Sequence, residues 1–332
     1  MPVLIEPPPS RAAPQPARPG ASGALVVGLV NNMPDSALEG TETQFLSLLQ
    51  AASGPRQVHL RLAALPEVAR GAEAGARIAA SYWTYDALTS GKVDALIVTG
   101  TEPRAASLRD EPYWGRMVEL LDFARSATVS SIWSCLAAHV AVLALDGVER
   151  QRLAEKRCGV YGHRVRAGHV LTEGLVSPHP VPHSRWNDLP PRALAAAGYT
   201  ILCESDETGA DTFVKHDRNM LVFLQGHPEY EQRTLLKEYQ RDVQRFLSGQ
   251  QPHYPTLPAG YFDATATALL EEFKRQALER SPAGPLPAFP FTAVAATLSD
   301  HWRAPAAALY ANWLAHVAAQ QAATGIRGRQ AL

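Results

Sequence analysis

Short apolar runs that alternate with helical segments constrain the fold of this chain more than any other feature. Four short strands are predicted, at residues 24–30, 58–62, 93–98 and 129–134, and the second of them alternates between apolar and polar residues. The first run is almost continuously apolar, as in a strand that is buried on both faces of a parallel sheet. Residues 42–52 and 113–126 lie between the runs and carry apolar side chains at helical spacing. The first half of the chain is therefore predicted to form βαβ units of an α/β fold.

The second half of the chain contains strands that lie closer together in sequence. Residues 200–204, 212–215 and 220–224 read as strands with short connections, which favours an antiparallel extension of the sheet. Helices are predicted at residues 136–145 and 235–247. The fold class that follows is a flavodoxin-like α/β fold. It has a mainly parallel sheet flanked by helices, an antiparallel extension and a helical C-terminal addition.

Composition shifts suggest a division of the chain into four parts. Residues 1–23 form a Pro/Ala-rich leader that is predicted to be disordered, with order beginning near Ala24. Residues 24–250 form the main domain, within which residues 150–194, rich in His and Pro, look like an addition. Residues 251–300 read as an insertion with a helix at 263–279. Residues 301–332 are expected to hold a docking helix at 309–319 and a tail.

Charge and cysteine content narrow the functional class. The formal net charge is −1, so no basic excess suggests a nucleic-acid partner. No apolar run approaches the ~18 residues of a membrane span, and residues 1–23 lack the apolar core of a secretory signal. Three widely spaced cysteines are few and odd for a disulfide framework. We therefore expect a cytoplasmic protein that acts on small molecules, without a nucleic-acid or membrane partner.

Cys135 occupies the position of a nucleophile elbow. It follows the strand at 129–134 directly and precedes an apolar helix, whose dipole favours a thiolate. The backbone N–H of Leu136 is placed to hold an oxyanion, and we also predict a contribution from the backbone of Thr101. The alternative is a buried structural thiol. That alternative is stronger for Cys158, in a polar segment without a preceding strand, and for Cys203, inside a strand.

A base and its orienting group follow the strand at 220–224. His227 and Glu229 are separated by Pro228, which stiffens the loop, and a nucleophilic thiol needs such a pair. The alternative is a surface turn with an incidental His and Glu. Four other histidines are close in sequence but lack regular ligand spacing, so no metal site is predicted: His163, His169, His179 and His183.

The segments around these residues resemble the homoserine O-succinyltransferase family, whose fold is similar to class I glutamine amidotransferases. The resemblance runs from about Leu25 to Trp313 and is interrupted between Gln251 and Ser299. It rests first on Trp133-Ser134-Cys135 and on the sequence from Gly226 to Tyr230. Further segments match in order: Asn32-Met33-Pro34, Glu42-Thr43-Gln44-Phe45, Leu96-Ile97-Val98-Thr99-Gly100, Glu155-Lys156, Gly159-Val160-Tyr161, Pro182-His183-Ser184-Arg185, Glu238, Arg241-Asp242, Trp302-Arg303 and Asn312-Trp313-Leu314.

This resemblance implies an acyltransferase of methionine biosynthesis. Cys135 would accept an acyl group from acyl-CoA as a thioester, and His227, oriented by Glu229, would act as general base on the L-homoserine hydroxyl. Substrate-binding positions of the family fall on three residues: Lys156, Ser184 and Arg241. Without the resemblance, Lys156 and Arg241 read as surface ion pairs. No permanently bound cofactor is expected; succinyl-CoA or acetyl-CoA is the co-substrate, and a homodimer is expected.

The loop after Gly100 departs from the family pattern and bears on the acyl group. Arg104 stands where many relatives carry a small residue, and an arginine there can pair with the free carboxylate of a succinyl group, which favours succinyl over acetyl. The helix predicted at 263–279 is also atypical. Three alternatives remain open: acylation of L-serine or a related hydroxy-amino acid, a glutamine amidotransferase-like hydrolase, and a non-catalytic ligand-binding protein.

Overall fold

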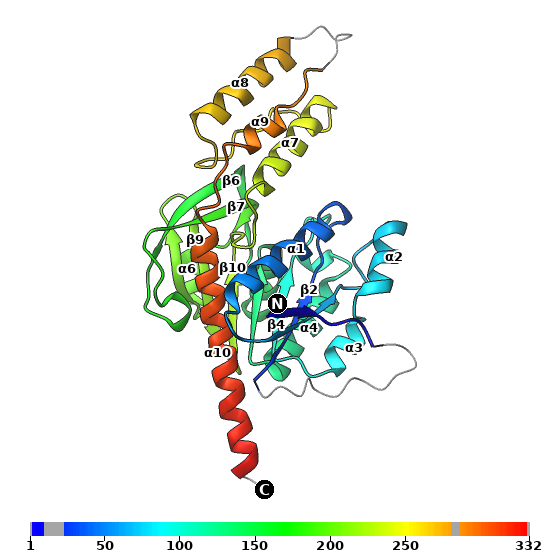
Figure 1. Ribbon diagram of the computed structural model, residues 1–332, viewed down its shortest axis with the longest axis vertical. Helices are drawn as coiled ribbons and strands as arrows, with labels where there is room; N and C mark the ends of the chain where they lie inside the picture. Colours follow the sequence, from blue (N-terminus) through cyan, green and yellow to red (C-terminus); the bar gives the residue numbers. More distant parts are fainter. Residues whose placement is uncertain (1, 10–22, 280–285, 331–332) are drawn as a thin grey trace.

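A ten-stranded mixed sheet forms the centre of the molecule (Figure 1). The computed structural model describes residues 2–9, 23–279 and 286–330, with side chains described up to residue 323. The strand order is β1-β3-β2-β4-β5-β10-β9-β8-β6-β7. The strands are β1 (Val3–Ile5), β2 (Leu25–Val30), β3 (Val58–Ala63), β4 (Ala95–Thr99), β5 (Ser130–Ser134), β6 (Gln151–Val165), β7 (His179–Asp188), β8 (Thr200–Ser205), β9 (Gly209–His216) and β10 (Met220–Leu224).

The fold class predicted from the sequence is confirmed. β3, β2, β4, β5 and β10 pair in parallel, which is the 2-1-3-4-5 order of flavodoxin-like sheets. β9, β8, β6 and β7 continue the sheet in antiparallel fashion. The central strands β2, β4, β5 and β10 are buried along their whole length, which explains why β2, β4 and β10 are almost continuously apolar. β5 is buried as well, although three of its five residues are serines.

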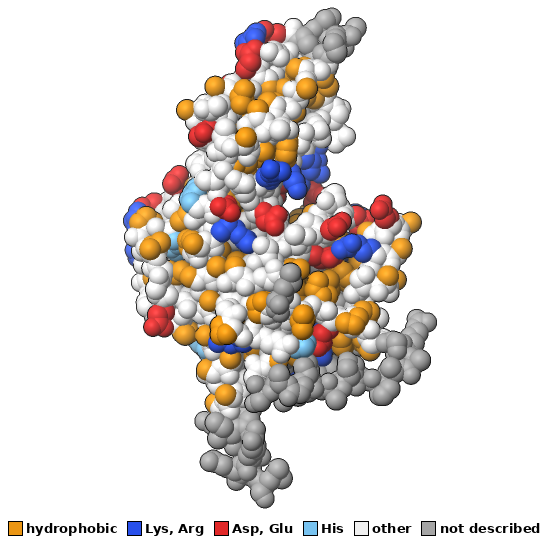
Figure 2. Space-filling view, in the orientation of Figure 1, with side chains coloured by type: hydrophobic (Ala, Val, Ile, Leu, Met, Phe, Trp, Pro, Cys, Tyr) orange, Lys and Arg blue, Asp and Glu red, His pale blue; other side chains and the backbone are white. Residues whose placement is uncertain are grey.

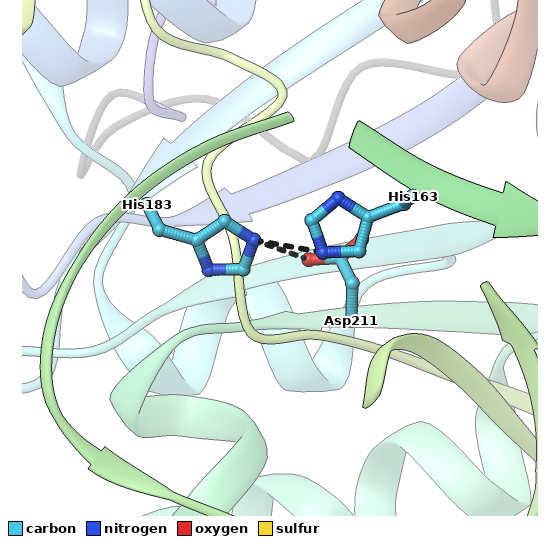
Figure 3. Close-up of side chains that lie close together, drawn as sticks. All are labelled: His163, His183 and Asp211. Atoms are coloured by element: carbon cyan, nitrogen blue, oxygen red, sulfur yellow. Dashed lines mark hydrogen bonds and ion pairs between the residues drawn. The ribbon is translucent and has the colours of Figure 1, made fainter. Parts of the chain in front are cut away.

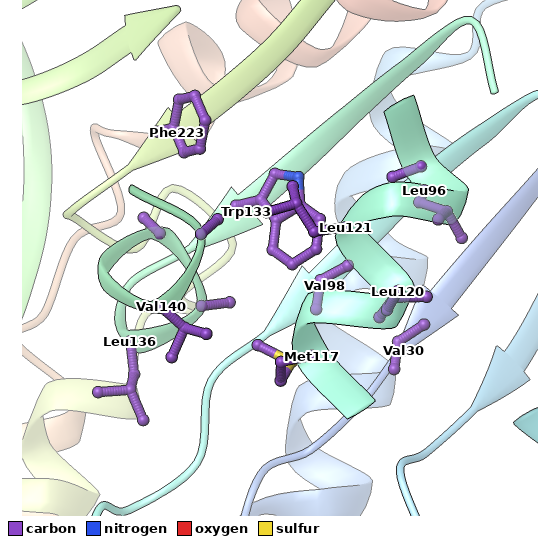
Figure 4. Packing of buried hydrophobic residues seen from close by; sticks show 14 of the residues in the cluster. Val30, Leu96, Val98, Met117, Leu120, Leu121, Trp133, Leu136, Val140 and Phe223 are labelled. Carbon is purple, nitrogen blue, oxygen red and sulfur yellow. The ribbon is translucent and has the colours of Figure 1, made fainter. Parts of the chain in front are cut away.

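Helices cover both faces of the sheet. They are α1 (Asp35–Ala52), α2 (Ala72–Ser81), α3 (Tyr85–Ser90), α4 (Trp114–Ala127), α5 (Leu136–Asp146), α6 (Pro191–Ala196), α7 (Thr234–Leu247), α8 (Ala264–Glu279), α9 (Phe291–Ala295) and α10 (Arg303–Gln330), with short 3₁₀ turns η1 (Leu108–Asp110) and η2 (Val170–Thr172). Trp133 lies in a core of side chains from α4 and α5 (Figure 4). A second core contains Phe45 of α1 and Trp313 of α10, which pack against side chains of the sheet.

The expectation of a disordered leader is wrong at its beginning. Val3–Ile5 form β1, which pairs in parallel with β3 from Val58 to Leu60. Val3 is buried in the second core, so its burial and the pairing with β3 offset the entropy cost of ordering three residues. Residues 10–22 lie outside the described residues.

The segment at 150–194 is part of the sheet and not an addition to it. β6 and β7 pair in antiparallel fashion and carry the sheet to its far edge. A register shift between Arg152 and Arg157 breaks the alternation of polar and apolar residues in β6, which hid the strand in the sequence. Two prolines, Pro180 and Pro182, obscured β7, and such prolines are tolerated because this strand lies at the edge.

An arm of helices projects from one end of the sheet (Figure 1). α7, α8 and α9 share a third core, in which Leu235 and Phe273 are buried. The helix predicted at 263–279 is confirmed as α8, while α10 extends well beyond the predicted 309–319. None of the helices in the described ranges is long and apolar enough to cross a membrane.

Candidate active site

Cys135 sits in a sharp turn between β5 and α5, as the elbow hypothesis predicts. Its φ of 52° and ψ of −115° place a non-glycine residue in a strained region of backbone space. Its N–H donates to Leu224 O at 2.7 Å, which ties the turn to the end of the neighbouring strand β10. The side chain is partly exposed at the N-terminus of α5. This position favours a negatively charged sulfur.

The register of two parallel strands brings His227 to the same edge of the sheet. Ser134 of β5 pairs with Leu224 of β10, so Cys135 follows that pair by one residue and His227 by three. The His227 N–H donates to Pro182 O at 2.8 Å, and the Gly226 N–H donates to Asp211 Oδ1 at 2.8 Å. The loop that carries the histidine is thus held by two hydrogen bonds from outside it.

His227 and Glu229 form a buried pair. His227 Nδ1 lies 2.8 Å from Glu229 Oε1, and both side chains are less than a tenth exposed. Burial alone would lower the pKa of His227, but the Glu229 carboxylate and the neighbouring Cys135 sulfur outweigh burial and raise it well above its usual range. The raised pKa favours the imidazolium form of His227 beside the Cys135 sulfur.

The loop after β4 approaches the N-terminus of α5 closely. A Cβ placed on Gly100 would lie 2.4 Å from Leu136 Cβ and 3.1 Å from Ala137 N, so only glycine fits there. Leu136 is the first residue of α5, and its N–H is free of the helical hydrogen-bond pattern. The backbone of Thr101 follows at this close approach. The two predicted oxyanion donors therefore lie on segments that pack against each other, although their donation to a substrate remains a prediction.

The three predicted substrate-binding residues lie around two acidic residues of α7. Lys156 Nζ is 2.7 Å from Asp242 Oδ2 and 3.7 Å from Glu238 Oε2. Ser184 Oγ donates to Glu238 Oε2, and Arg241 Nη2 lies 3.1 Å from Asp242 Oδ1. Burial alone would lower the pKa of Lys156, but Glu238 and Asp242 outweigh it and raise the pKa. The cluster therefore contains cationic groups that could pair with the carboxylate of a free amino acid and anionic groups that could pair with its ammonium group.

Tyr230 connects this cluster to the pair of His227 and Glu229. Its ring stacks on His227 with centroids 4.3 Å apart, and its hydroxyl donates to Glu238 Oε1 at 2.6 Å. Trp302 Nε1 donates to Tyr230 O at 2.7 Å from the other side. Figure 2 shows basic and acidic side chains gathered where the arm meets the sheet domain.

Arg104 lies in the loop after β4, as expected, but its side chain is exposed. Its backbone N–H and that of Ala105 donate to Glu111 Oε1 at 2.6 and 2.7 Å. Glu111 itself is buried, so this carboxylate fixes the path of the loop. The structure brings no other described side chain to the Arg104 guanidinium within hydrogen-bond or ion-pair distance. Its predicted part in acyl specificity stays a prediction.

The other two cysteines have different surroundings. Cys158 lies inside β6, which corrects the expectation that no strand precedes it. Burial raises the pKa of the Cys158 thiol to about 12, and burial likewise raises that of Cys203 in β8 to about 12. Both side chains are therefore thiols at neutral pH, and neither lies at a helix N-terminus.

Three buried groups, His163, His183 and Asp211, form a network behind the histidine loop (Figure 3). His183 Nε2 lies 3.3 Å from His163 Nε2 and 3.5 Å from Asp211 Oδ1, a spacing that a metal ion could occupy. However, Arg185 Nε donates to His183 Nδ1 at 3.3 Å, and burial lowers the pKa of His183 well below its usual value. A neutral His183 that accepts at Nδ1 carries its proton on Nε2, which makes Nε2 a donor. We therefore interpret the cluster as a hydrogen-bond network.

Sequence reasoning missed the roles of Tyr230, Glu238 and Asp242 in the site. Glu238 and Asp242 are four residues apart on α7, so they lie on one face of the helix together with the partly exposed Arg241. This spacing was visible in the sequence, but the helix gave no sign that Lys156 and Ser184 meet that face from β6 and β7.

Comparison with known proteins gives consistent matches over most of the chain. A family model described as homoserine O-succinyltransferase matches residues 8–324. The chain is 44% identical to a homoserine O-succinyltransferase of Rhodopseudomonas palustris over 305 residues, which is 92% of each chain. It is 46% identical to one of Methylorubrum extorquens over 88% of this chain and 87% of that protein. A glutamine amidotransferase structure from Thermotoga maritima aligns with a TM-score of 0.47 and 13% identity, covering 90% of this chain and 99% of that one.

Proposed function

This chain belongs to the homoserine O-succinyltransferase family, and we propose that it transfers a succinyl group from succinyl-CoA to the hydroxyl of L-homoserine through a thioester on Cys135. The observation that carries the proposal is Cys135 itself, a strained residue at a helix N-terminus beside the buried His227–Glu229 pair. A thiol with no catalytic task has no need of this backbone strain.

The first half-reaction acylates the enzyme. The Cys135 thiolate attacks the thioester carbonyl of succinyl-CoA, and the N–H groups of Leu136 and Thr101 stabilise the oxyanion that forms. Collapse of this intermediate breaks the bond to the CoA sulfur. The His227 imidazolium donates its proton to the departing CoA thiolate, so CoA leaves as a thiol and His227 becomes neutral.

The second half-reaction transfers the acyl group. Neutral His227, oriented by Glu229, takes the proton of the homoserine hydroxyl as its oxygen attacks the thioester carbonyl. The Cys135 sulfur leaves as a thiolate beside the reformed imidazolium. Atoms and charges balance over the cycle, and the enzyme returns to its starting state without a bound cofactor.

The cluster around α7 supports binding of the acceptor. Arg241 and Lys156 can pair with the α-carboxylate of homoserine, and Glu238 can accept from its ammonium group. Tyr230 stacks on His227 and donates a hydrogen bond to Glu238. It therefore sets the distance between the charged groups of the bound amino acid and its reacting hydroxyl. Because Lys156 and Arg241 now pair with Asp242 of the protein, the acceptor carboxylate exchanges one set of ion pairs for another.

An intact-mass experiment tests the proposal. The protein is incubated with succinyl-CoA, with or without L-homoserine or L-serine, and CoA release is followed. We expect one succinyl adduct on Cys135, discharged by L-homoserine. Cys135→Ala should fold and form no adduct, whereas the matched variant Cys203→Ala should retain it, since this buried thiol lies in strand β8. Unchanged turnover in Cys135→Ala contradicts the nucleophile assignment, and discharge by L-serine instead contradicts the acceptor.

Two further properties belong to the proposal. We expect a homodimer, and the cysteine content favours a cytoplasmic protein. Sedimentation of the full chain at micromolar concentration measures the first, and a monomer at that concentration contradicts it.

A further inference from the structure

Asp211, a residue of β9, contacts the loop of His227 through both its backbone and its side chain. β9 and β10 pair up to Leu224, and the loop leaves the sheet directly after that pairing. The Gln225 N–H donates to Asp211 O at 3.0 Å, and the Gly226 N–H donates to Asp211 Oδ1 at 2.8 Å. The carboxylate therefore takes the place of a strand partner where the backbone ladder ends.

The next amide of the loop is fixed from the opposite side. The His227 N–H donates to Pro182 O of β7 at 2.8 Å, so β9 and β7 hold two consecutive amides. Gly226 fills the space between them, because an added Cβ would lie 2.7 Å from Asp211 Oδ1 and 2.9 Å from Pro182 O. Pro228 restricts His227 further, since a residue before proline disfavours helical angles. With both amides fixed, the ring of His227 can move mainly through its own side-chain torsions.

Asp211 is a buried carboxylate that holds the loop without help from a strong cation. It is 1% exposed, Thr212 Oγ1 donates to its Oδ2 at 2.8 Å, and His183 Nε2 lies 3.5 Å from its Oδ1 (Figure 3). Burial lowers the pKa of His183 well below its usual value, so this imidazole is neutral at pH 7. Among the described residues, Asp211 forms no ion pair with a lysine or an arginine. Its hydrogen bonds must offset the cost of its burial, and the bond from Gly226 is one of them.

We propose that Asp211 is a positioning residue, which holds the Gly226 amide and thereby fixes where the His227 ring lies. The inference rests on the proposed function, in which His227 moves a proton in both half-reactions. Glu229 has a different task, because its carboxylate contacts the ring itself at Nδ1. Glu229 therefore sets the charge and orientation of the ring, while Asp211 sets the position of the backbone that carries it. A displacement of about 1 Å at a reacting group can lower a rate about 100-fold.

The substitution Asp211→Ala tests this role in the full-length protein. It leaves the Gly226 N–H without its acceptor, so acylation by succinyl-CoA and discharge by L-homoserine should both slow about 100-fold. The half-saturating concentrations of both substrates should stay within about threefold. The basic limb of the pH profile should not move, because Glu229, which raises the pKa of His227, is still in place. Each rate is divided by the folded fraction from circular dichroism.

Two further variants separate the bond to Gly226 from charge and from stability. Asp211→Asn keeps an acceptor oxygen without the charge, so it should lose at most about fivefold in either rate. Asp94→Ala is the matched control. Asp94 is also buried, and its Oδ2 accepts from the Val26 N–H at 2.8 Å, but it precedes β4 at the end of the sheet opposite the active site. This variant loses the same kind of bond and should keep full activity per folded molecule.

Several outcomes overturn the inference. Unchanged rates in Asp211→Ala, or an equal loss in Asp94→Ala, show that Asp211 serves only the stability of the fold. A loss in Asp211→Asn as large as that in Asp211→Ala, or a shifted pH limb, shows that Asp211 acts through its charge. Where Asp211→Ala yields little folded protein, Asp211→Glu decides, since it keeps the charge and moves the carboxylate by about 1.5 Å. We expect it to lose at least tenfold, and rates within twofold of the wild type contradict the positioning role.

The wild-type protein separates this inference from the proposed function. If it does not transfer a succinyl group to L-homoserine, the proposed function itself has failed. If it does and Asp211→Ala keeps its rates, only this inference has failed.

Discussion

Gly100 offers the sharpest test of the oxyanion arrangement, through the substitution Gly100→Ala. The added Cβ would stand 2.4 Å from Leu136 Cβ and 3.0 Å from Leu136 Cα. Ordinary carbon contacts are about 3.5–4.0 Å, so the two segments must separate by about 1 Å. Two of the three nearest atoms belong to the backbone of α5, which cannot rotate away.

The separation displaces the N–H groups of Leu136 and Thr101 relative to each other. Loss of one oxyanion donor typically lowers kcat by 10²–10³-fold, and overpacking of this kind costs about 1–3 kcal/mol of stability. We therefore expect kcat for succinyl transfer to fall about 100-fold, while most of the protein stays folded at 25 °C.

The measurement is the steady-state rate of CoA release, divided by the folded fraction from circular dichroism. Gly115→Ala is the matched control. Gly115 is an exposed position in α4 with nothing within 4 Å of the added Cβ, so this change should stabilise the helix by about 0.5–1 kcal/mol and leave kcat unaltered. A Gly100→Ala variant with kcat within twofold of the wild type would refute the reasoning.

Two further predictions concern His227, the proposed general base, and the C-terminal helix α10. Glu229→Gln removes the carboxylate that raises the pKa of His227, so the basic limb of the pH profile for acylation should move to lower pH; an unmoved limb contradicts this. His227 also binds its proton more tightly in the folded chain. This interaction stabilises the fold below the unfolded-state pKa of about 6.5 and is lost as pH rises through the raised folded-state value, so Glu229→Gln should destabilise most at low pH in urea titrations. Trp313→Ala should cost about 3–5 kcal/mol, measured in the same titrations, because this side chain is fully buried and donates to Ser130 Oγ at 3.0 Å; a cost below 1 kcal/mol would show that α10 is not part of the core.

The centre of the fold could be predicted because its strands obey local rules. β2, β4 and β10 are buried on both faces, so each one appears in the sequence as a short apolar run. Cys135 directly follows β5, and the pair of His227 and Glu229 lies just beyond β10. The sheet order then places them at one edge without further information.

The rest of the site depends on contacts between distant segments, which local patterns do not encode. Lys156 meets Asp242 across 86 residues of sequence, and Ser184 meets Glu238 across 54. β6 and β7 escaped prediction because one bulge and two prolines disturb their alternation.

The junction between the arm and α10 has a consequence for the order in which the enzyme matures. Trp302 donates to the carbonyl of Tyr230 across 72 residues, and Arg303 donates to that of Glu229 across 74. During synthesis, the catalytic loop therefore emerges from the ribosome well before the side chains that brace it. A nascent chain that has already folded its sheet still lacks these braces. We expect it to stay inactive until Trp302, Arg303 and α10 have emerged and docked.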